Sequence, residues 1–414
     1  MSQSKVVAAV EIGTSKVAVL LGRFSEDNKL SIIGHSVCLA RGIKKGVIEN
    51  LPLASDCVHA ALQAAESKAS TRIDEVYLAL TGQHLEGTQN FGNATIRDAK
   101  GIVKGVDVDQ AISDAKRREL PETRSYIHYI RNHFELDGIP VYNPIERQGS
   151  RLEVSYWTVH ADTEMIKNYL RIFCGYDIKV RDIVISSVAA ASILLEQGEK
   201  DLGALVIDIG GGTTDWALFH NGYIIRTGVI AVGGDHITND LSVGLRTGRT
   251  RAEKIKVEHG RAYYKSEDKN EKVWLIGDFT IGDKEFPKAA VTRIIEARVK
   301  EIFEIIKSEL KREDLLKSSE IASGVVLTGG ASKLDGIAKV AEDVLGLEVR
   351  SADIEASFDA DLRKPEYTTV IGLLRYALTG DEEESENKET TNLMGGILEW
   401  FIGGKEPKYS TSKY

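Results

Sequence analysis

Short apolar runs rich in β-branched residues open the chain. Residues 6–12 and 16–24 flank a Gly-Thr-Ser turn, and residues 30–39 form a third run. Runs of this length bounded by turn residues predict three strands joined by tight turns. Apolar residues then recur at helical spacing over residues 53–69, and another apolar run covers residues 75–81. The β-β-β-α-β order predicts a mixed sheet in an α/β protein.

The pattern changes between about residues 84 and 161. Strand-like runs at 126–136 and 152–160 accompany a charged helical stretch at 107–120. This texture predicts a small α/β unit inserted into the first half of the chain. The helix, strand and alanine-rich helix expected to complete that half cover residues 163–175, 179–185 and 188–197.

The three-strand pattern then restarts. Residues 204–209 and 214–220 surround a second glycine turn, and residues 223–232 follow. This turn, Asp208-Ile-Gly-Gly-Gly-Thr-Thr-Asp215, echoes Glu11-Ile-Gly-Thr-Ser15, with an acid, an apolar residue and a glycine at the same corner. The two halves therefore have the pattern of an internal duplication.

The remainder of the chain contains an insert and two distinct terminal segments. A charged insert over residues 245–287 precedes a long amphipathic helix predicted over 289–310, and a buried strand is predicted at 324–327. Residues 380–391 are too acidic and polar to bury anything, which predicts a solvated linker. A short apolar island follows at 393–402.

The composition of the chain excludes several classes of protein and leaves the expected architecture unchanged. Sixty-two acidic and 53 basic residues leave a formal net charge of −9, which disfavours a general nucleic-acid binder. No window approaches the roughly 18 consecutive apolar residues of a membrane span, and the N-terminus lacks the pattern of a secretory signal. Three cysteines without a Cys-x-x-Cys pair indicate no disulfide framework. We therefore expect a cytoplasmic protein.

Three glycine turns carry the candidate chemistry. Glycine lets backbone N–H groups approach an anion without an intervening Cβ, and threonine hydroxyls add donors. For one turn alone, a hairpin whose polar groups satisfy one another is an equally good interpretation. Two hairpins in matching positions, together with a third turn over residues 328–332, instead predict a clamp around a polyphosphate. Lys16 would supply positive charge, and Asp208 a carboxylate for metal-bound water.

These turns resemble the nucleotide-binding motifs of the actin, sugar-kinase and heat-shock-chaperone ATPase superfamily. Glu11-Ile-Gly-Thr-Ser is similar to its first phosphate loop, Asp208-Ile-Gly-Gly-Gly-Thr-Thr-Asp to its second, and Gly324-Val-Val-Leu-Thr-Gly-Gly-Ala-Ser to its adenosine motif. The narrower resemblance is to the FtsA family, bacterial actin homologues of cell division. It is carried by Glu11 in place of the usual aspartate and by residues 229–240 and 252–260, and it covers nearly the whole chain.

The resemblance implies a duplicated actin-like fold (ribonuclease H-like) with two inserted small subdomains and a C-terminal amphipathic helix. It assigns residues 1–83, 162–200 and 367–379 to subdomain 1A, 84–161 to the inserted subdomain 1C, 201–244 and 289–366 to subdomain 2A, and 245–288 to subdomain 2B. An acidic flexible linker over 380–391, a membrane-targeting helix over 392–403 and a tail over 404–414 would follow.

The same resemblance implies the site residues, with ATP and Mg²⁺ as cofactors. Those expected to bind the nucleotide are Gly13, Thr14, Ser15, Lys16, Gly210, Gly211, Gly212, Thr213, Thr214, Gly234, Glu253, Lys256, Gly329, Gly330, Ala331 and Ser332. Glu11 and Asp208 would order the waters of the metal ion. Without the resemblance, Glu253 and Lys256 would be interpreted as a surface ion pair at i,i+3 on a helix.

One position departs from the superfamily pattern. ATPases of this fold usually orient the attacking water with a glutamate or glutamine at the start of the helix before the second phosphate loop. Ser186 is expected there, and a serine hydroxyl cannot polarise water comparably. We therefore expect at most a slow ATPase, assign no catalytic residue, and expect nucleotide mainly to control polymerisation.

The resemblance also implies a function. The protein would polymerise on the cytoplasmic face of the cell membrane, tether the ring of the tubulin-like protein FtsZ to it, and recruit later division proteins. A small-molecule kinase acting on a sugar or an acid is the alternative, although no motif for its catalytic aspartate is found. A chaperone-like ATPase is disfavoured, because no room for a peptide-binding domain is expected beyond residue 380.

Two surfaces are expected to meet partners. The resemblance implies that the C-terminal peptide of FtsZ binds near subdomain 2B, where Arg298 and Arg293 could pair with its acidic groups; a solvated basic face is the alternative. Residues 392–403 would form a helix on the membrane surface, too short to span a bilayer; docking on the protein's own core is the alternative. Its apolar face comprises Leu393, Met394, Ile397, Leu398, Trp400, Phe401 and Ile402.

Overall fold

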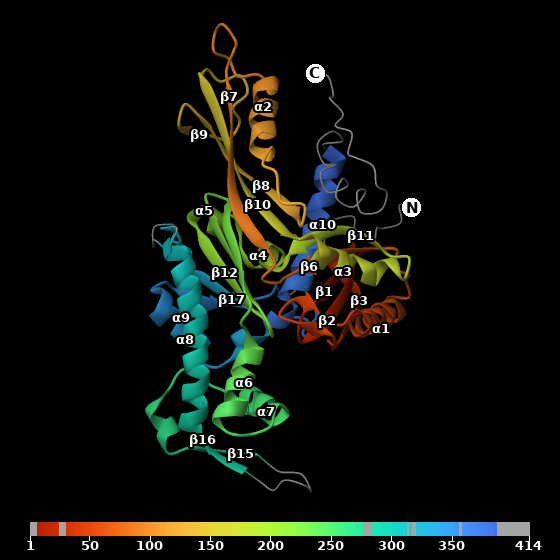
Figure 1. The fold of residues 1–414 in the computed structure, drawn as a ribbon, viewed down its shortest axis with the longest axis vertical. Helices are drawn as coiled ribbons and strands as arrows, with labels where there is room; N and C mark the ends of the chain where they lie inside the picture. Colours follow the sequence, from red (N-terminus) through yellow and green to blue (C-terminus); the bar gives the residue numbers. More distant parts are fainter. Residues whose placement is uncertain are drawn as a thin grey trace.

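The computed structural model describes residues 6–24, 30–275, 284–312, 314–316, 320–355 and 358–386. The first half is built on a five-stranded sheet in the order β11-β6-β1-β2-β3 (Figure 1). Strands β1 (Val6–Ile12), β2 (Lys16–Phe24) and β3 (Leu30–Leu39) are antiparallel to one another. On the other side of β1, β6 (Glu75–Leu80) and β11 (Lys179–Ile185) run parallel to it.

The second half repeats this sheet strand for strand, in the order β14-β13-β12-β17-β18. Here β12 (Ala204–Ile209), β13 (Thr214–His220) and β14 (Tyr223–Ile230) are antiparallel. Strands β17 (Val325–Thr328) and β18 (Val349–Ser351) lie parallel on the far side of β12. The two sheets share strand order and strand directions, so the predicted duplication is confirmed.

One helix covers a face of each sheet at the equivalent point of the chain. Helix α1 (Leu51–Ala69) begins two residues before the predicted start, because the Asn50 side chain accepts the Leu53 N–H at 3.1 Å and caps it. It buries apolar residues at helical spacing, among them Val58, Leu62 and Ala65. Helix α8 (Lys288–Arg312) is its counterpart in the second half and buries a continuous apolar stripe.

Two further helices are exchanged between the halves. Helix α4 (Ser186–Leu194) follows the last strand of the first sheet, yet it packs its alanines against β12 and β13 of the second. Helix α10 (Thr368–Glu386) follows the second sheet and packs against β1, β2 and β6 of the first. The two helices cross at Gly372, where a Cβ would lie 1.9 Å from the Ala189 carbonyl oxygen. This exchange holds the two halves together beneath the cleft that separates them.

The inserted unit forms a four-stranded sheet covered by one helix, at the top of Figure 1. Its elements are β7 (Glu86–Thr95), α2 (Gly105–Lys116), β8 (Arg124–Leu136), β9 (Ile139–Val141) and β10 (Arg151–Asp162). Helix α2 starts and ends earlier than the predicted 107–120. Helix α3 (Thr163–Cys174) then returns the chain to the first half, as predicted.

A second, smaller insert lies at the opposite end of the molecule in Figure 1. It contains α6 (Gly234–Gly244), α7 (Arg249–His259) and the hairpin β15 (Lys272–Leu275) and β16 (Lys284–Pro287). Helix α6 packs on α7 and on α8, and α7 also contacts β15. The sequence pattern indicated only a charged segment here.

Two further predictions differ from the structure. The single helix expected over 188–197 is wrong: α4 ends at Leu194, and α5 (Gln197–Leu202) begins after Glu196, whose N–H donates to the Glu199 carboxylate at 2.9 Å. Helix α10 continues to Glu386 and so extends into the segment expected as a linker. The apolar island at 392–403 and the tail lie outside the described residues.

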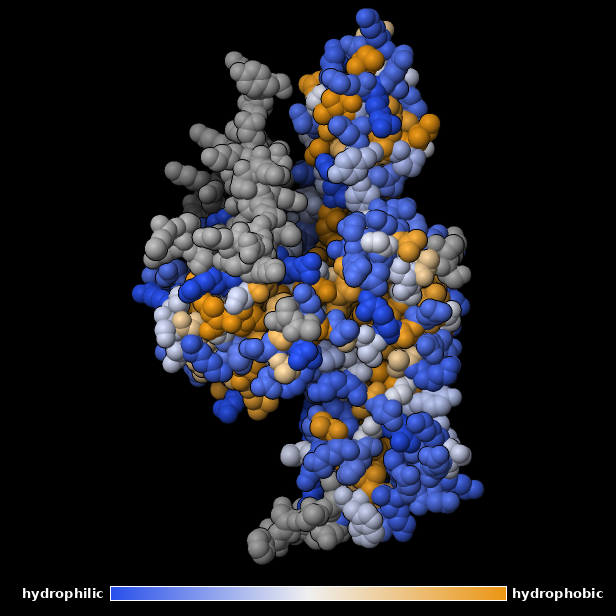
Figure 2. All heavy atoms as spheres, turned by 180° about the vertical axis from the view of Figure 1, so that it is seen from behind, coloured by the Kyte–Doolittle hydropathy of each residue, from blue (hydrophilic) through white to orange (hydrophobic). Residues whose placement is uncertain are grey.

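Most of the surface in Figure 2 is hydrophilic, and the hydrophobic side chains form separate groups. Some of these groups lie on the inserted unit. The exposed apolar side chains of that unit include Phe91 and Ile139. Within the part of the chain that the structure describes, no helix is both long and apolar enough to cross a membrane.

Candidate functional site

A pocket of about 310 Å³ lies between the two halves. This volume is at the lower end of small-molecule sites, roughly 300–1,000 Å³. The pocket is formed by the β1–β2 turn, the β12–β13 turn, the ends of β6 and β11, and two 3₁₀ turns over Gly330–Lys333 and Pro365–Tyr367. Its lining residues are Glu11, Gly13, Thr14, Ser15, Lys16, Thr81, Ser186, Asp208, Gly210, Gly211, Gly212, Thr213, Asp215, Gly329, Gly330, Lys333, Glu366 and Tyr367.

The two hairpin turns have the same backbone geometry and meet tip to tip. In the first, the Gly13 N–H donates to the Lys16 carbonyl at 2.9 Å, and in the second the Gly210 N–H donates to that of Thr213, also at 2.9 Å. A Cβ at Gly212 would lie 2.4 Å from the Thr14 hydroxyl oxygen. Only glycine therefore allows the turns to approach this closely.

The N–H groups at the tips of both turns are available to a ligand. Among the described residues, no acceptor pairs with the N–H groups of Thr14, Ser15, Gly211 or Gly212. Unpaired N–H groups on residues that line one pocket suit an anion with several oxygens, because such donors otherwise remain unsatisfied. The geometry fits the polyphosphate clamp predicted from the sequence.

Carboxyl groups crowd the floor of the pocket. Burial, followed by the nearby charge of Glu11, raises the pKa of Asp208 to about 6. Burial and then the charge of Asp208 raise the pKa of Asp215 to about 8, although hydrogen bonds from Thr81 and Thr213 oppose this shift. Lys16 offsets part of the charge by pairing with Glu11 at 2.7 Å. The donor set therefore suits an added cation.

Such a cation would keep water ligands. The described residues contain no group of three or more histidine, cysteine or acidic side chains placed to ligate a metal directly. Mg²⁺ usually retains several waters and takes few protein ligands, with substrate phosphates completing its shell. Glu11 and Asp208, which are expected to order the waters of such an ion, both line the pocket.

Asp215 and Thr81 belong to the site but were not predicted. The Thr81 hydroxyl donates to both carboxylate oxygens of Asp215 at 2.7 Å and so joins β6 of the first half to β13 of the second. A signal was present in the sequence, because Asp215 pairs directly opposite Asp208 across the hairpin and side chains of such pairs share one face. Lys333, Glu366 and Tyr367 carried no comparable local signal.

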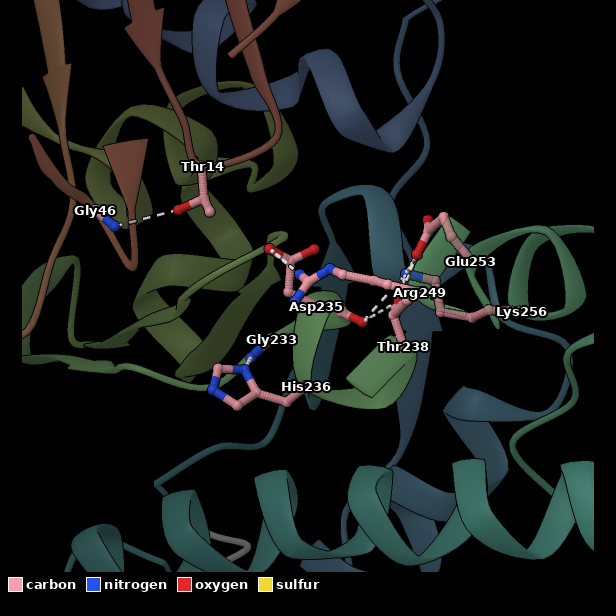
Figure 3. Close-up of polar contacts among 10 residues, drawn as sticks. Thr14, Gly46, Gly233, Asp235, His236, Thr238, Arg249, Glu253 and Lys256 are labelled. Carbon is pink, nitrogen blue, oxygen red and sulfur yellow. Dashed lines mark hydrogen bonds and ion pairs between the residues drawn. The ribbon is translucent and has the colours of Figure 1, made fainter. Parts of the chain in front are cut away.

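Gly234, Glu253 and Lys256 are connected to the second turn without lining the pocket, and Figure 3 shows Glu253 and Lys256 beside Thr238. The Gly234 N–H donates to the Gly210 carbonyl at 2.9 Å, which attaches the start of α6 to the turn. The Lys256 ammonium donates to the Gly234 carbonyl at 3.1 Å and to the Thr238 hydroxyl at 2.9 Å. It also pairs with Glu253 at 2.7 Å, the i,i+3 ion pair that was the alternative interpretation. These residues support the turn and do not line the pocket.

Figure 3 also shows two polar contacts near the turns, one in each half. On the first half, the Gly46 N–H donates to the Thr14 hydroxyl at 3.2 Å. On the second, Asp235 pairs with Arg249 at 3.2 Å. The first contact holds the tip of one hairpin turn, and the second holds a residue whose N–H donates to Gly211 of the other.

The other predicted residues divide into pocket-facing and buried ones. At Gly330 a Cβ would meet only the Glu366 Cβ, at 3.8 Å, so this position borders open space. Thr214 is fully buried and donates to the Val232 carbonyl at 2.8 Å, so its side chain faces the core and not the pocket. Ser332 donates to the Gly329 carbonyl at 2.7 Å, which stabilises the third turn. Ala331 lies beside Gly234.

Ser186 is where the sequence placed it. It is the first residue of α4 and lines the pocket, and its hydroxyl donates to the Leu80 carbonyl at 3.3 Å. No carboxylate or amide side chain occupies this position, so the group that usually orients water in the superfamily is absent from it.

The arginines expected to bind a peptide already have partners. Asp240 accepts from Arg298 through both oxygens, at 2.6 and 3.1 Å, and Glu301 pairs with the same guanidinium at 2.5 Å. The Arg293 guanidinium lies 5.1 Å from the Tyr264 ring centre. A peptide carboxylate could use Arg298 only by displacing or sharing these acids.

Comparison with known proteins places the chain in a family. The model of the family "Cell division protein FtsA" matches residues 205–372, and that of the "SHS2 domain inserted in FTSA" matches residues 82–160. The cell division protein FtsA of Neisseria meningitidis is 33% identical over 401 residues, which is 95% of this chain and 96% of that protein. The FtsA of Pseudomonas aeruginosa is 32% identical over 387 residues, which is 91% of this chain and 90% of that protein.

Solved structures of low sequence identity share the fold. A PilM-PilN type IV pilus biogenesis complex gives a TM-score of 0.63 at 17% identity and covers 90% of this chain and 98% of that one. MreB5 of Spiroplasma citri bound to ADP gives 0.54 at 16% identity, covering 92% and 99%. The MamK double helical filament gives 0.51 at 11% identity, covering 90% and 98%. The chain has the actin-like fold and belongs to the FtsA family of cell division proteins.

Proposed function

We propose that the cleft binds ATP with Mg²⁺ and that the nucleotide controls self-association of the chain. The pair of facing hairpin turns, with four unpaired N–H groups on residues that line one pocket, is the observation that carries this proposal. Residues 13–16 and 210–213 would hold the phosphates, and Glu11 and Asp208 the waters of the ion. When bound, Mg²⁺ would neutralise charge on the phosphates.

The adenosine would lie against the third turn. Gly330 borders open space, so a large side chain there would occupy the pocket without a clash in the folded protein. Titration calorimetry with Mg-ATP should show at least tenfold weaker binding for Gly330→Leu, a loss of about 1.4 kcal/mol, at an unchanged melting temperature. Gly175→Leu, at an exposed glycine with nothing within 4 Å, is the control and should bind as the wild type does. Equal affinity of both variants would contradict the site.

Self-association is supported by the actin-like fold. The MamK structure is a double helical filament, and MreB5 was solved with ADP. Sedimentation of the full chain should give larger assemblies with Mg-ATP than without nucleotide. Assemblies of equal size with and without Mg-ATP would contradict control of self-association by the nucleotide.

We also propose that the chain binds the C-terminal peptide of FtsZ and recruits later division proteins. Arg298 is held by Asp240, so Asp240→Asn should release the guanidinium and strengthen binding of an acidic FtsZ peptide in a polarisation assay. Arg298→Glu should weaken it, whereas Arg72→Glu, far more exposed and outside the second half, should not. If all three variants bind like the wild type, the peptide site lies elsewhere.

The proposed location is the cytoplasmic face of the cell membrane, through residues 392–403. The seven apolar side chains at helical spacing support this proposal, and Trp400 suits the headgroup boundary. Trp400→Glu and a truncation after Glu386 should both remain in the supernatant when the full chain pellets with vesicles. Trp274→Glu, at an exposed tryptophan of the second insert, is the control and should pellet. Equal pelleting of the truncation and the full chain would refute membrane binding by this segment.

A further inference from the structure

Thr369 holds one oxygen of the Asp208 carboxylate. It lies in the first turn of α10, only 3% exposed, and its hydroxyl donates to Asp208 Oδ2 at 2.7 Å. On its other side, Asp208 Oδ1 lies against Gly329, where a Cβ would be only 2.2 Å away. The carboxylate is therefore fixed between a hydroxyl donor and a backbone position that admits no side chain.

The neighbouring Thr368 anchors the same helical turn to a different place. Its hydroxyl contacts the Thr328 hydroxyl at 2.7 Å and donates to the Pro365 carbonyl at 2.9 Å. Thr368 is also fully buried, yet none of its hydrogen bonds reaches Asp208. The two adjacent threonines thus have separable contacts, one to the third turn and one to the carboxylate.

The Thr369 bond also crosses between the halves. Helix α10 packs its apolar face on the first sheet, whereas Asp208 ends β12 of the second. The orientation of this carboxylate therefore depends on a helix that belongs to the opposite half.

We propose that Thr369 is a positioning residue that orients Asp208 toward the waters of the metal ion, a role that rests on the proposed Mg-ATP site. A terminal carboxylate torsion is broad, so a carboxylate without a fixed donor samples many orientations. One hydroxyl occupies one of about four lone-pair sites on the carboxylate and leaves the others for water. Loss of a hydrogen bond in the outer shell around a metal ion commonly lowers metal affinity about 10–100-fold.

The test measures the effect on Mg²⁺ binding separately from the effect on ATP binding. ATP affinity is measured by calorimetry in EDTA and across a Mg²⁺ titration for wild type, Thr369→Val, Thr369→Ser and Thr368→Val. Thr369→Val should move the Mg²⁺ midpoint at least about tenfold upward while leaving ATP binding in EDTA unchanged. Thr369→Ser retains the hydroxyl and should restore the wild-type midpoint. Thr368→Val is the matched control, which should lower the melting temperature and leave the midpoint in place.

Each outcome has one meaning. A wild-type midpoint in Thr369→Val, with Mg²⁺ strengthening ATP binding in both proteins, would overturn the role of Thr369 alone. A wild type whose ATP binding ignores Mg²⁺, or that binds no ATP, would overturn the proposed function and this role with it. If Thr369→Val does not fold, Thr369→Ala is measured in its place. In an Asp208→Asn background the same threonine change should have no further effect, and an added shift there would refute action through Asp208.

Discussion

The indole N–H of Trp157 donates to the hydroxyl of Thr227 at 2.9 Å and joins the inserted unit to the second half of the molecule. Trp157 lies on β10, and Thr227 lies on β14, the outer strand of the second sheet. Arg226 stacks its guanidinium 4.7 Å from the indole centre and donates to Gln89 of β7 at 2.7 Å. Because the inserted unit is continuous with the first half, this contact bridges the two halves outside the cleft.

Loss of the indole donor should loosen this bridge. Trp157→Phe removes the hydrogen bond and part of a buried ring, which should cost about 1–3 kcal/mol of unfolding free energy. Amide hydrogen exchange in β14 should accelerate more than exchange in β12, which lies inside the sheet. Trp274→Phe, at a tryptophan that is 61% exposed, is the control and should leave both unchanged. Unaltered exchange of β14 in Trp157→Phe would show that the contact does not hold the unit.

The crossing of α4 and α10 should tolerate no side chain at Gly372. An added Cβ would lie 1.9 Å from the Ala189 carbonyl oxygen, so the two helices would have to separate. Gly372→Ala should therefore destabilise the fold by about 1–3 kcal/mol or more, measured by urea unfolding. Gly198→Ala in α5 meets nothing within 4 Å and should instead stabilise by up to about 1 kcal/mol. Equal stability of the two variants would refute tight packing at the crossing.

Hydrolysis should be slow, because Ser186 stands where a water-orienting acid or amide would be needed. Steady-state phosphate release at saturating Mg-ATP should remain far below about 10 s⁻¹, the median for enzymes. Ser186→Ala should not lower that rate, since the hydroxyl donates to the Leu80 carbonyl and has no proton-accepting role. A rate near the median, or a loss of turnover in Ser186→Ala, would contradict this interpretation.

Most strands of the two large sheets could be predicted, because they are apolar runs bounded by turn residues, although the three-residue β18 was not among them. Strand β7 could not be predicted either, since its sequence contains glycine and asparagine at positions that look like a loop. A Cβ at Gly87 would lie 2.0 Å from the Trp157 indole, so glycine is required there. A Cβ at Gly92 would lie 2.1 Å from the carbonyl oxygen of Ala111 in α2, so glycine is required there too. Such requirements arise from distant contacts, which no local pattern encodes.

The same distinction applies to the pocket. Its two glycine hairpin turns are local features, and the sequence located them at residues 13–16 and 210–213. Glu366 and Tyr367 enter the pocket from the 3₁₀ turn before α10, so their place depends on how that helix packs on the first sheet. Helix exchange between the halves could not be inferred from hydrophobic spacing, because α4 and α10 would bury the same residues against either sheet.

The last prediction concerns pH and His128. This residue of β8 is 9% exposed, and its Nε2 accepts the N–H of Ile185 at 3.2 Å, directly before Ser186. Burial lowers the pKa of His128 from 6.5 to about 4. An accepting Nε2 requires a neutral ring, so protonation would break the link between the inserted unit and the pocket.

The sign of the effect follows from linkage. Between pH 6.5 and 4 the unfolded chain binds a proton at this histidine that the folded chain does not, so the unfolding free energy falls as the pH falls through this range. The stabilising contribution is fully present above pH 6.5, and its loss on acidification amounts to about 3 kcal/mol at most. His84, whose pKa burial also lowers to about 4, contributes in the same direction.

Urea unfolding at several pH values from 7.5 to about 4.5 measures this dependence. His128→Gln keeps an acceptor but does not titrate, so its unfolding free energy should fall less steeply with acidification than that of the wild type, with His84 accounting for part of the remaining slope. His259→Gln, at the end of α7, is the control and should retain the wild-type slope. A wild-type slope in His128→Gln as well would mean that this buried histidine is not the group that titrates on unfolding.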